Sequence, residues 1–222
     1  MEQLKLYAPY LLEGLWTTVQ LTVMASVLAC IIALTTGIAR CSPRWWIRAV
    51  PSCFVEVFRG TPCYAQLFWV FFVLPMFGPS ISPMVAATGV MGASIGSYGS
   101  ELVRGAIKNV ALGQYEACTA LNYTRYQMLV RIIIPQAMIA IIPPATNLLI
   151  DLLKLTPLAS LITVAELTQT ALTMRQQTGN TAAALFIILL GYFVLASMIA
   201  WVFKRIEFKT GRWATDSPGG VS

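Results

Sequence analysis

Residues 14–39, GLWTTVQLTVMASVLACIIALTTGIA, form a long stretch without a single charged side chain. A helix needs about 20 apolar residues to cross the hydrocarbon core of a bilayer, and this stretch exceeds that length. In the whole chain, 57% of the 222 residues are hydrophobic, 11% are charged and the mean hydropathy is +0.71. Soluble domains average about 25% charged residues. The sequence therefore predicts a polytopic, all-α membrane protein in contact with the lipid bilayer.

Basic residues follow the apolar stretches in short clusters. The clusters are Arg40, Arg44 and Arg48; Arg104, Lys108, Arg125 and Arg131; and Lys204, Arg205, Lys209 and Arg212. Cytosolic loops carry an excess of Lys and Arg, so these positions account for the net charge of +6 without nucleic acid as a partner. We expect about five transmembrane helices, over residues 14–39, 51–74, 83–105, 127–153 and 180–203. The N-terminus is expected outside and the C-terminus in the cytosol, without a cleavable signal peptide.

Two proline-containing stretches predict breaks within these spans. In Arg59-Gly60-Thr61-Pro62, Thr61 is expected to cap a new helix and Pro62 to occupy its first position. Pro143-Pro144 is expected to interrupt the fourth span, because each proline removes a backbone donor. A packing kink and a bend that lines a wet cavity are both open readings of that second break.

Small residues recur through the third span. Gly92 and Gly96 form a G-x-x-x-G pattern, and Gly89 and Gly99 continue it on either side. Such patterns let helices approach closely in lipid. We expect this span to lie inside the bundle.

Residues 113–135, GQYEACTALNYTRYQMLVRIIIP, lie between the third and fourth spans, on the predicted cytosolic side. Gly113 is expected to open a short helix over about residues 113–122, with Glu116 near its positive N-terminal end. Asn122 can adopt the left-handed conformation that ends a helix. Thr124 and Gln127 match a capping box that starts the next helix. This turn chemistry predicts a rigid projection, which we name the 113–135 segment.

The 113–135 segment resembles the EAA motif of ABC importer permeases, E-A-A-x3-G-x9-I-x-L-P. Glu116-Ala117, Asn122 and Ile132-Ile133-Ile134-Pro135 have the same spacing. The departures are Cys118 for Ala, Asn122 for Gly and Ile134 for Leu. Each replacement is small or suits the same backbone conformation.

Other stretches resemble the subfamily that imports polar amino acids. Residues 56–62, EVFRGTP, are similar to its V-E-x-F-R-G-T-P signature, and residues 98–107, YGSELVRGAI, to Y-x-x-E-x-x-R-G-A-I. Residues 135–137, PQA, and 154–158, KLTPL, resemble its P-Q-A and K-x-T-S-L stretches, with Pro157 in place of Ser. The resemblance covers about residues 14–203 and implies a type I ABC importer permease fold that works as a dimer.

The resemblance implies that residues 113–122 are a coupling helix. Gly113, Glu116, Ala117 and Asn122 would then dock on a separate ABC ATPase dimer. The sequence has no G-x-x-x-x-G-K-[ST] stretch, so ATP and Mg²⁺ are expected on that partner and this chain is expected to be a transport subunit, not an enzyme. A second permease subunit, identical or paralogous, and an extracytoplasmic solute-binding protein are the other implied partners. The implied location is the bacterial inner membrane.

Catalytic and metal chemistry find little support in the residue types. The chain has no histidine, which excludes Ser-His and Cys-His catalysis and His-ligated metals. Its five cysteines form no C-x-x-C pair, so no metal site is expected. An intramembrane enzyme is therefore disfavoured.

Charged side chains at membrane depth are the remaining candidates for function, because such charges are costly unless they are paired. Glu56 with Arg59, and Glu101 with Arg104, are spaced i, i+3 near the cytosolic ends of neighbouring spans. We expect a structural or gating ion-pair network, with solute contact as the other reading.

Asn147, Asp151 and Lys154 share one face of the fourth helix. Asp151 and Lys154 could bind the two charges of a zwitterionic solute, or simply pair with each other. Glu166 and Arg175, in the outer connection, are weaker candidates that could contact the external solute-binding protein.

Two other transport readings stay open. An ion-coupled secondary transporter subunit is the main alternative, although such proteins usually contain internal repeats and need no cytosolic projection. A purely structural partner subunit is another. The sequence leaves the solute open between a polar amino acid, an opine and an ectoine-like compound.

Overall fold

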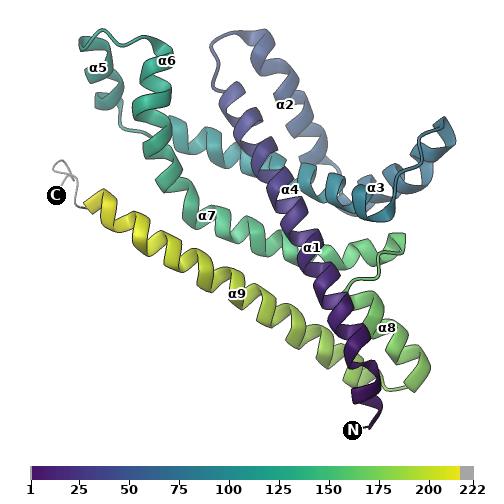
Figure 1. The fold of residues 1–222 in the computed structure, drawn as a ribbon. Coiled ribbons are helices and arrows are strands. Elements are labelled where there is room, and N and C mark those ends of the chain that lie inside the picture. Colours follow the sequence, from purple (N-terminus) through teal and green to yellow (C-terminus); the bar gives the residue numbers. More distant parts are fainter. Residues whose placement is uncertain (1, 216–222) are drawn as a thin grey trace.

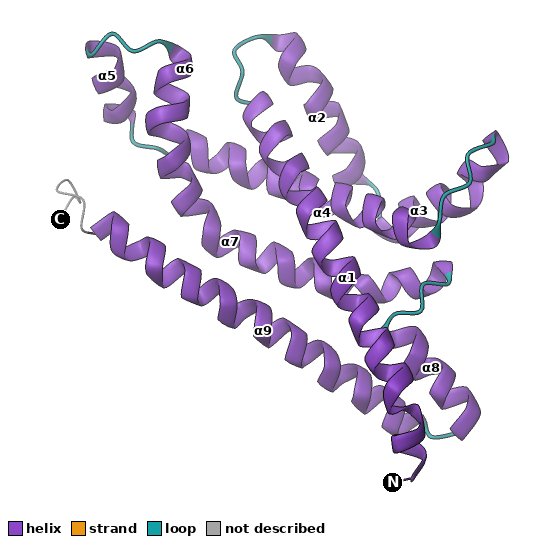
Figure 2. Cartoon of the chain, in the orientation of Figure 1, coloured by secondary structure: helices purple, strands orange, loops and turns teal. Residues whose placement is uncertain are grey.

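The computed structural model describes residues 2–215, with side chains from 7–208, and this part of the chain is built from helices alone (Figures 1 and 2). The elements in chain order are α1 Glu2–Ala39, α2 Trp45–Gly60, α3 Cys63–Phe68, η1 Trp69–Val73, η2 Leu74–Phe77, α4 Pro83–Lys108, α5 Leu112–Ala120, α6 Arg125–Met128, η3 Leu129–Ile133, α7 Ile134–Leu155, η4 Thr156–Ile162, α8 Leu167–Thr178 and α9 Thr181–Thr215. Lys209 and Arg212, from the last basic cluster, lie outside the residues whose side chains are described.

The interface between α1 and α4 is the most extensive in the bundle, and α1 crosses α4 in Figure 1. Glycines of α4 make that crossing close: a Cβ on Gly96 would lie 2.8 Å from Ile32 Cβ, and one on Gly99 would lie 2.7 Å from Ala33 Cβ. The apolar core grows around this contact, with Leu21 and Met91 fully buried. The expectation that the glycine-rich helix lies inside the bundle is confirmed.

Apolar length distinguishes the helices that can cross a membrane. Within the described residues, Tyr7–Ala39, Arg125–Ile162 and Thr181–Phe208 are each long and apolar enough. The pair Trp45–Gly60 and Cys63–Phe77 also passes, as a bent unit. Helix α4 covers the third expected span but falls outside that set, because its many glycines and serines lower its hydropathy. It buries much of its surface in the bundle. The N-outside orientation stays a prediction.

The second expected span breaks sharply where the sequence suggested. The axes of Trp45–Gly60 and Cys63–Phe77 differ by 104°. The capping prediction was wrong in detail: α3 begins at Cys63 with Pro62 as its N-cap, and Thr61 ends α2. The Thr61 hydroxyl donates to the Val57 carbonyl at 2.7 Å, so it serves the carbonyl end of α2. The Gln66 side-chain amide then spans the corner, donating to the Phe58 carbonyl at 3.0 Å.

The fourth expected span is continuous, and the predicted interruption at Pro143-Pro144 was wrong. Helix α7 runs through both prolines. The irregular backbone lies earlier, in the π-helical turn η3 directly before α7. Pro135, at the start of α7, cannot donate the N–H of a regular α-helix, and a π turn is one way to accommodate such a missing donor.

Candidate functional site

Helices α5 and α6 form a hairpin at the end of the molecule opposite the N-terminus (Figure 1). Between them Asn122 has φ 57°, the left-handed conformation expected from its position. The capping box is also present: Thr124 Oγ1 accepts from Gln127 N at 3.3 Å, and Gln127 Oε1 accepts from Thr124 N at 3.0 Å. The turn of the 113–135 segment is therefore held by its own side chains. Gly113 lies one residue inside the helix, which begins at Leu112.

One face of α5 is fixed to the bundle and the other is free. The Tyr115 hydroxyl donates to the Ile107 carbonyl of α4 at 2.8 Å, and burial raises the pKa of Tyr115. Cys118, one turn later, is only 3% exposed. Glu116 and Ala117 are exposed, as are Gly113 and Asn122. The four predicted docking residues thus lie at the surface of an anchored element. The two residues that attach α5 to the bundle, Tyr115 and Cys118, were not predicted. Their i, i+3 spacing, which places them on one face of a helix, was the available signal in the sequence.

A cluster of arginines surrounds Glu101, where α1, α2 and α4 meet. Arg104 Nη2 and Arg40 Nη2 each lie 2.7 Å from a different oxygen of the Glu101 carboxylate. Arg59 Nη1 lies 3.4 Å from the oxygen that Arg40 binds. The predicted Glu101–Arg104 pair is confirmed. Arg40 was expected only as a marker of the cytosolic loop, and nothing local in the sequence links it to a residue 61 positions away.

The predicted pair of Glu56 with Arg59 was wrong. Arg59 turns toward Glu101 on α4, and its guanidinium also lies 5.3 Å from the centre of the Tyr98 ring. Glu56 is exposed, and its carboxylate has no ion-pair or hydrogen-bond partner within the described residues. Arg59 finds a better-positioned carboxylate across the helix interface than along its own helix.

Asn147, Asp151 and Lys154 lie on one exposed face of α7, as their spacing predicted. Lys154 Nζ is 3.8 Å from Asp151 Oδ1, a loose contact between two well-exposed side chains. An apolar cavity of about 370 Å³ lies among α1, α4, α7 and Phe203, but none of these three polar residues lines it. The cavity holds no charged side chain in its wall, so it does not suit a zwitterion.

Glu166 is buried, so the expectation that it contacts an external protein was wrong. It caps α8, accepting from Thr168 N at 2.8 Å and from Gln169 N at 2.9 Å. The Tyr192 hydroxyl of α9 donates to it at 2.6 Å. Burial raises the pKa of the Glu166 carboxyl, and these three hydrogen bonds oppose the rise. Arg175, further along α8, is partly exposed.

Comparison with known proteins agrees with this arrangement of helices. Residues 25–208 match the family described as binding-protein-dependent transport system inner membrane component. The "probable amino-acid ABC transporter permease protein y4tF" of Sinorhizobium fredii is 36% identical over 90% of this chain and 87% of its own length. The L-cystine transport system permease protein TcyB of Bacillus subtilis is 40% identical over 72% of this chain and 68% of its own.

A solved structure shares both sequence and fold with this chain. It is described as the crystal structure of an amino acid ABC transporter with histidines, and its matching chain is 30% identical with a TM-score of 0.85. The match covers 91% of this chain and 95% of that one. The protein described here is therefore a multi-pass membrane transport subunit that belongs to the binding-protein-dependent transport system inner membrane component family.

Proposed function

We propose that this chain is the permease subunit of an ATP-driven ABC importer for polar amino acids or similar zwitterions in a bacterial inner membrane. The observation that carries the proposal is the exposed face of α5, with Glu116 and Ala117 free while Tyr115 fixes the helix to α4. A separate ABC ATPase dimer would bind this face and hold ATP and Mg²⁺. A second permease subunit and an external solute-binding protein would complete the importer.

The mechanism follows from how α5 is attached. Because Tyr115 binds the end of α4, a displacement of α5 by the closing ATPase dimer is passed to α4. Helix α4 in turn is joined to α1 and α2 through the arginines on Glu101. A series of direct contacts of this kind favours movement of packed helices together, and such movement can shift the permease between outward and inward states.

The exposed polar face of α7 is the proposed solute contact. Lys154 would attract the carboxylate of an amino acid and Asp151 its ammonium group, with Asn147 as a neutral hydrogen-bonding neighbour. Lys154 Nζ and Asp151 Oδ1 are 3.8 Å apart. An incoming zwitterion would therefore have only a weak ion pair to break. The change Lys154→Met is expected to weaken solute dependence of transport. Unchanged half-saturation for uptake in that variant would refute this part of the proposal.

Glu116→Lys tests the coupling role directly. The permease, its ATPase and the solute-binding protein are reconstituted in liposomes, and uptake of labelled amino acids is measured together with ATP hydrolysis. We expect uptake to be lost while the permease still inserts, because the reversed charge faces the ATPase. Glu13→Lys is the matched control, since Glu13 is an exposed glutamate in the N-terminal part of α1. The N-terminus lies at the end of the molecule opposite α5 and α6 (Figure 1). Equal uptake by the two variants would contradict the proposal.

A further inference from the structure

The cluster around Glu101 carries more positive charge than it neutralises. Three guanidinium groups, those of Arg40, Arg59 and Arg104, share one carboxylate. The formal balance within the cluster is therefore two positive charges in excess. Excess charge close to a membrane interior is unfavourable unless another group compensates it.

Arg59 is the arginine of the cluster that makes the fewest hydrogen bonds and ion pairs within the described residues. Arg104 directs both Nε and Nη2 to Glu101, at 2.9 and 2.7 Å, and Arg40 also donates to Ser52 at 3.3 Å. Arg59 makes a single contact with the carboxylate at 3.4 Å, and 42% of its side chain is exposed. A guanidinium has five N–H donors. Arg59 can thus bind a second carboxylate from outside the bundle.

Glu56 is the complementary group on the same helix. It lies three residues before Arg59, which places the two side chains about 60° apart around the axis of α2. It is exposed and without an ion pair within the described residues, and it is followed by the exposed apolar Val57. A carboxylate at membrane depth is costly unless it is paired. Helix α2 thus carries two neighbouring side chains of opposite charge: Glu56, which has no ion pair within the described residues, and Arg59, which has free N–H donors.

We infer that two copies of this chain meet along α2, with Glu56 of each copy paired to Arg59 of the other. In a two-fold interface a contact between residues i and j occurs twice, reciprocally. Each Arg59 then completes its coordination with a carboxylate that its own chain cannot supply in this geometry. The ion-pair cluster of each subunit is incomplete without its partner.

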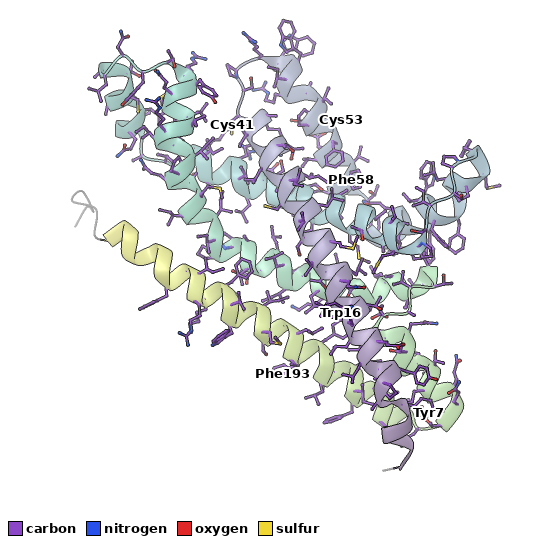
Figure 3. The ribbon with its side chains drawn as sticks, viewed as in Figure 1. Tyr7, Trp16, Cys41, Cys53, Phe58 and Phe193 are labelled. Atoms are coloured by element: carbon purple, nitrogen blue, oxygen red, sulfur yellow. The ribbon has the colours of Figure 1, made fainter. Side chains whose placement is uncertain are left out.

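Cross-linking between differently tagged copies tests this pairing. One copy carries Glu56→Cys and the other Arg59→Cys, with the exposed Cys30 and Cys53 replaced by alanine in both. A short bismaleimide is preferred to oxidation, because long charged side chains span more than a disulfide does. We expect a mixed-tag product severalfold more abundant than in the control, in which Phe58→Cys replaces Glu56→Cys. Phe58 lies on α2 (Figure 3). It is two residues from Glu56, so the two side chains lie on roughly opposite sides of the helix.

Charge reversal in trans provides a second measurement. Copies with Glu56→Arg or with Arg59→Glu place like charges together in dimers of their own kind, whereas a mixed dimer restores both reciprocal pairs. Co-purification through the two tags should therefore recover mixed dimers in excess over same-tag dimers. Cross-linking at the control level, or random mixing of the charge variants, would overturn the inference. It rests on the second permease subunit proposed above, but since neither assay needs ATPase or solute, its failure leaves the transport proposal standing.

Discussion

Replacing Gly96 by alanine is expected to push α1 and α4 apart at the centre of the bundle. The added Cβ would lie 2.8 Å from Ile32 Cβ, 2.9 Å from Ile32 Cγ2 and 3.1 Å from the Ala29 carbonyl oxygen. Neither neighbour can move alone, because Ile32 Cβ and the Ala29 oxygen are fixed to the backbone of α1. The helices themselves must shift to accept one methyl group.

The size of the effect follows from two opposed contributions. Overpacking a core of this density costs about 1–3 kcal/mol, and rigid neighbours place this position toward the upper end. Alanine gains about 1 kcal/mol over glycine in helix propensity. The net loss is therefore about 1–2 kcal/mol, or roughly 2–8 °C in Tm for a chain of this size. Thermal unfolding of the purified permease in detergent measures it.

Gly89→Ala is the matched control, because it lies on the same helix and nothing lies within 4 Å of its Cβ position. That variant should be stabilised by the higher helix propensity of alanine, and its Tm should rise slightly. The reasoning about close packing fails if Gly96→Ala and Gly89→Ala shift Tm in the same direction by the same amount.

Three further changes probe the contacts that hold the site. Tyr115→Phe removes the hydrogen bond to Ile107, about 0.5–1.5 kcal/mol, and should reduce solute-stimulated ATP hydrolysis without affecting insertion; unchanged stimulation would argue against α5 anchoring. Glu101→Gln leaves the arginines without their carboxylate and should lower the free energy of unfolding. The loss should be smaller than the roughly 3–5 kcal/mol of a fully buried pair, because the cluster is partly exposed. An unchanged Tm would contradict this. Glu166→Ala should destabilise more than Tyr192→Phe, since it removes a helix cap and every hydrogen bond to the carboxylate; calorimetry giving the reverse order would refute it.

Features governed by neighbouring residues were predictable from the sequence. Asn122 takes the left-handed conformation and Thr124 with Gln127 forms the capping box, because both depend on chemistry within four positions. Among the described residues, the first, fourth and fifth expected spans correspond to helices that are long and apolar enough to cross a membrane, because each holds an apolar stretch of sufficient length. The helices extend beyond the stretches, however, as α1 begins at Glu2 and not near residue 14.

Contacts between distant segments were not predictable. Glu56 and Arg59 have suitable spacing for a pair within one helix, yet Arg59 binds Glu101, which the fold brings closer. Glu166 looked like a polar loop residue and is instead fully buried under Tyr192. In both cases the deciding partner lies on another helix, and a single sequence carries no signal that identifies it.

Proline shows why local rules can also mislead. Pro62 lies at a corner of 104°, whereas Pro143 and Pro144 lie within a continuous helix. At the corner, Thr61 and Gln66 supply side-chain hydrogen bonds that serve the end of α2. A proline removes one donor in every case, but whether the helix ends there depends on what the neighbouring side chains offer the freed carbonyls.

The position of α4 connects the predicted coupling face with the rest of the molecule. It contacts α1, α2, α3 and α7 directly, and it holds α5 through the Ile107 carbonyl. Its glycines leave no space for sliding against α1 without repacking. A force applied to α5 therefore reaches the broken second helix, through Glu101 and Arg59, by a path of direct contacts. If α2 also meets its copy in a second subunit, that path ends at the interface between the two permease chains, where a change in angle would open or close the route between them.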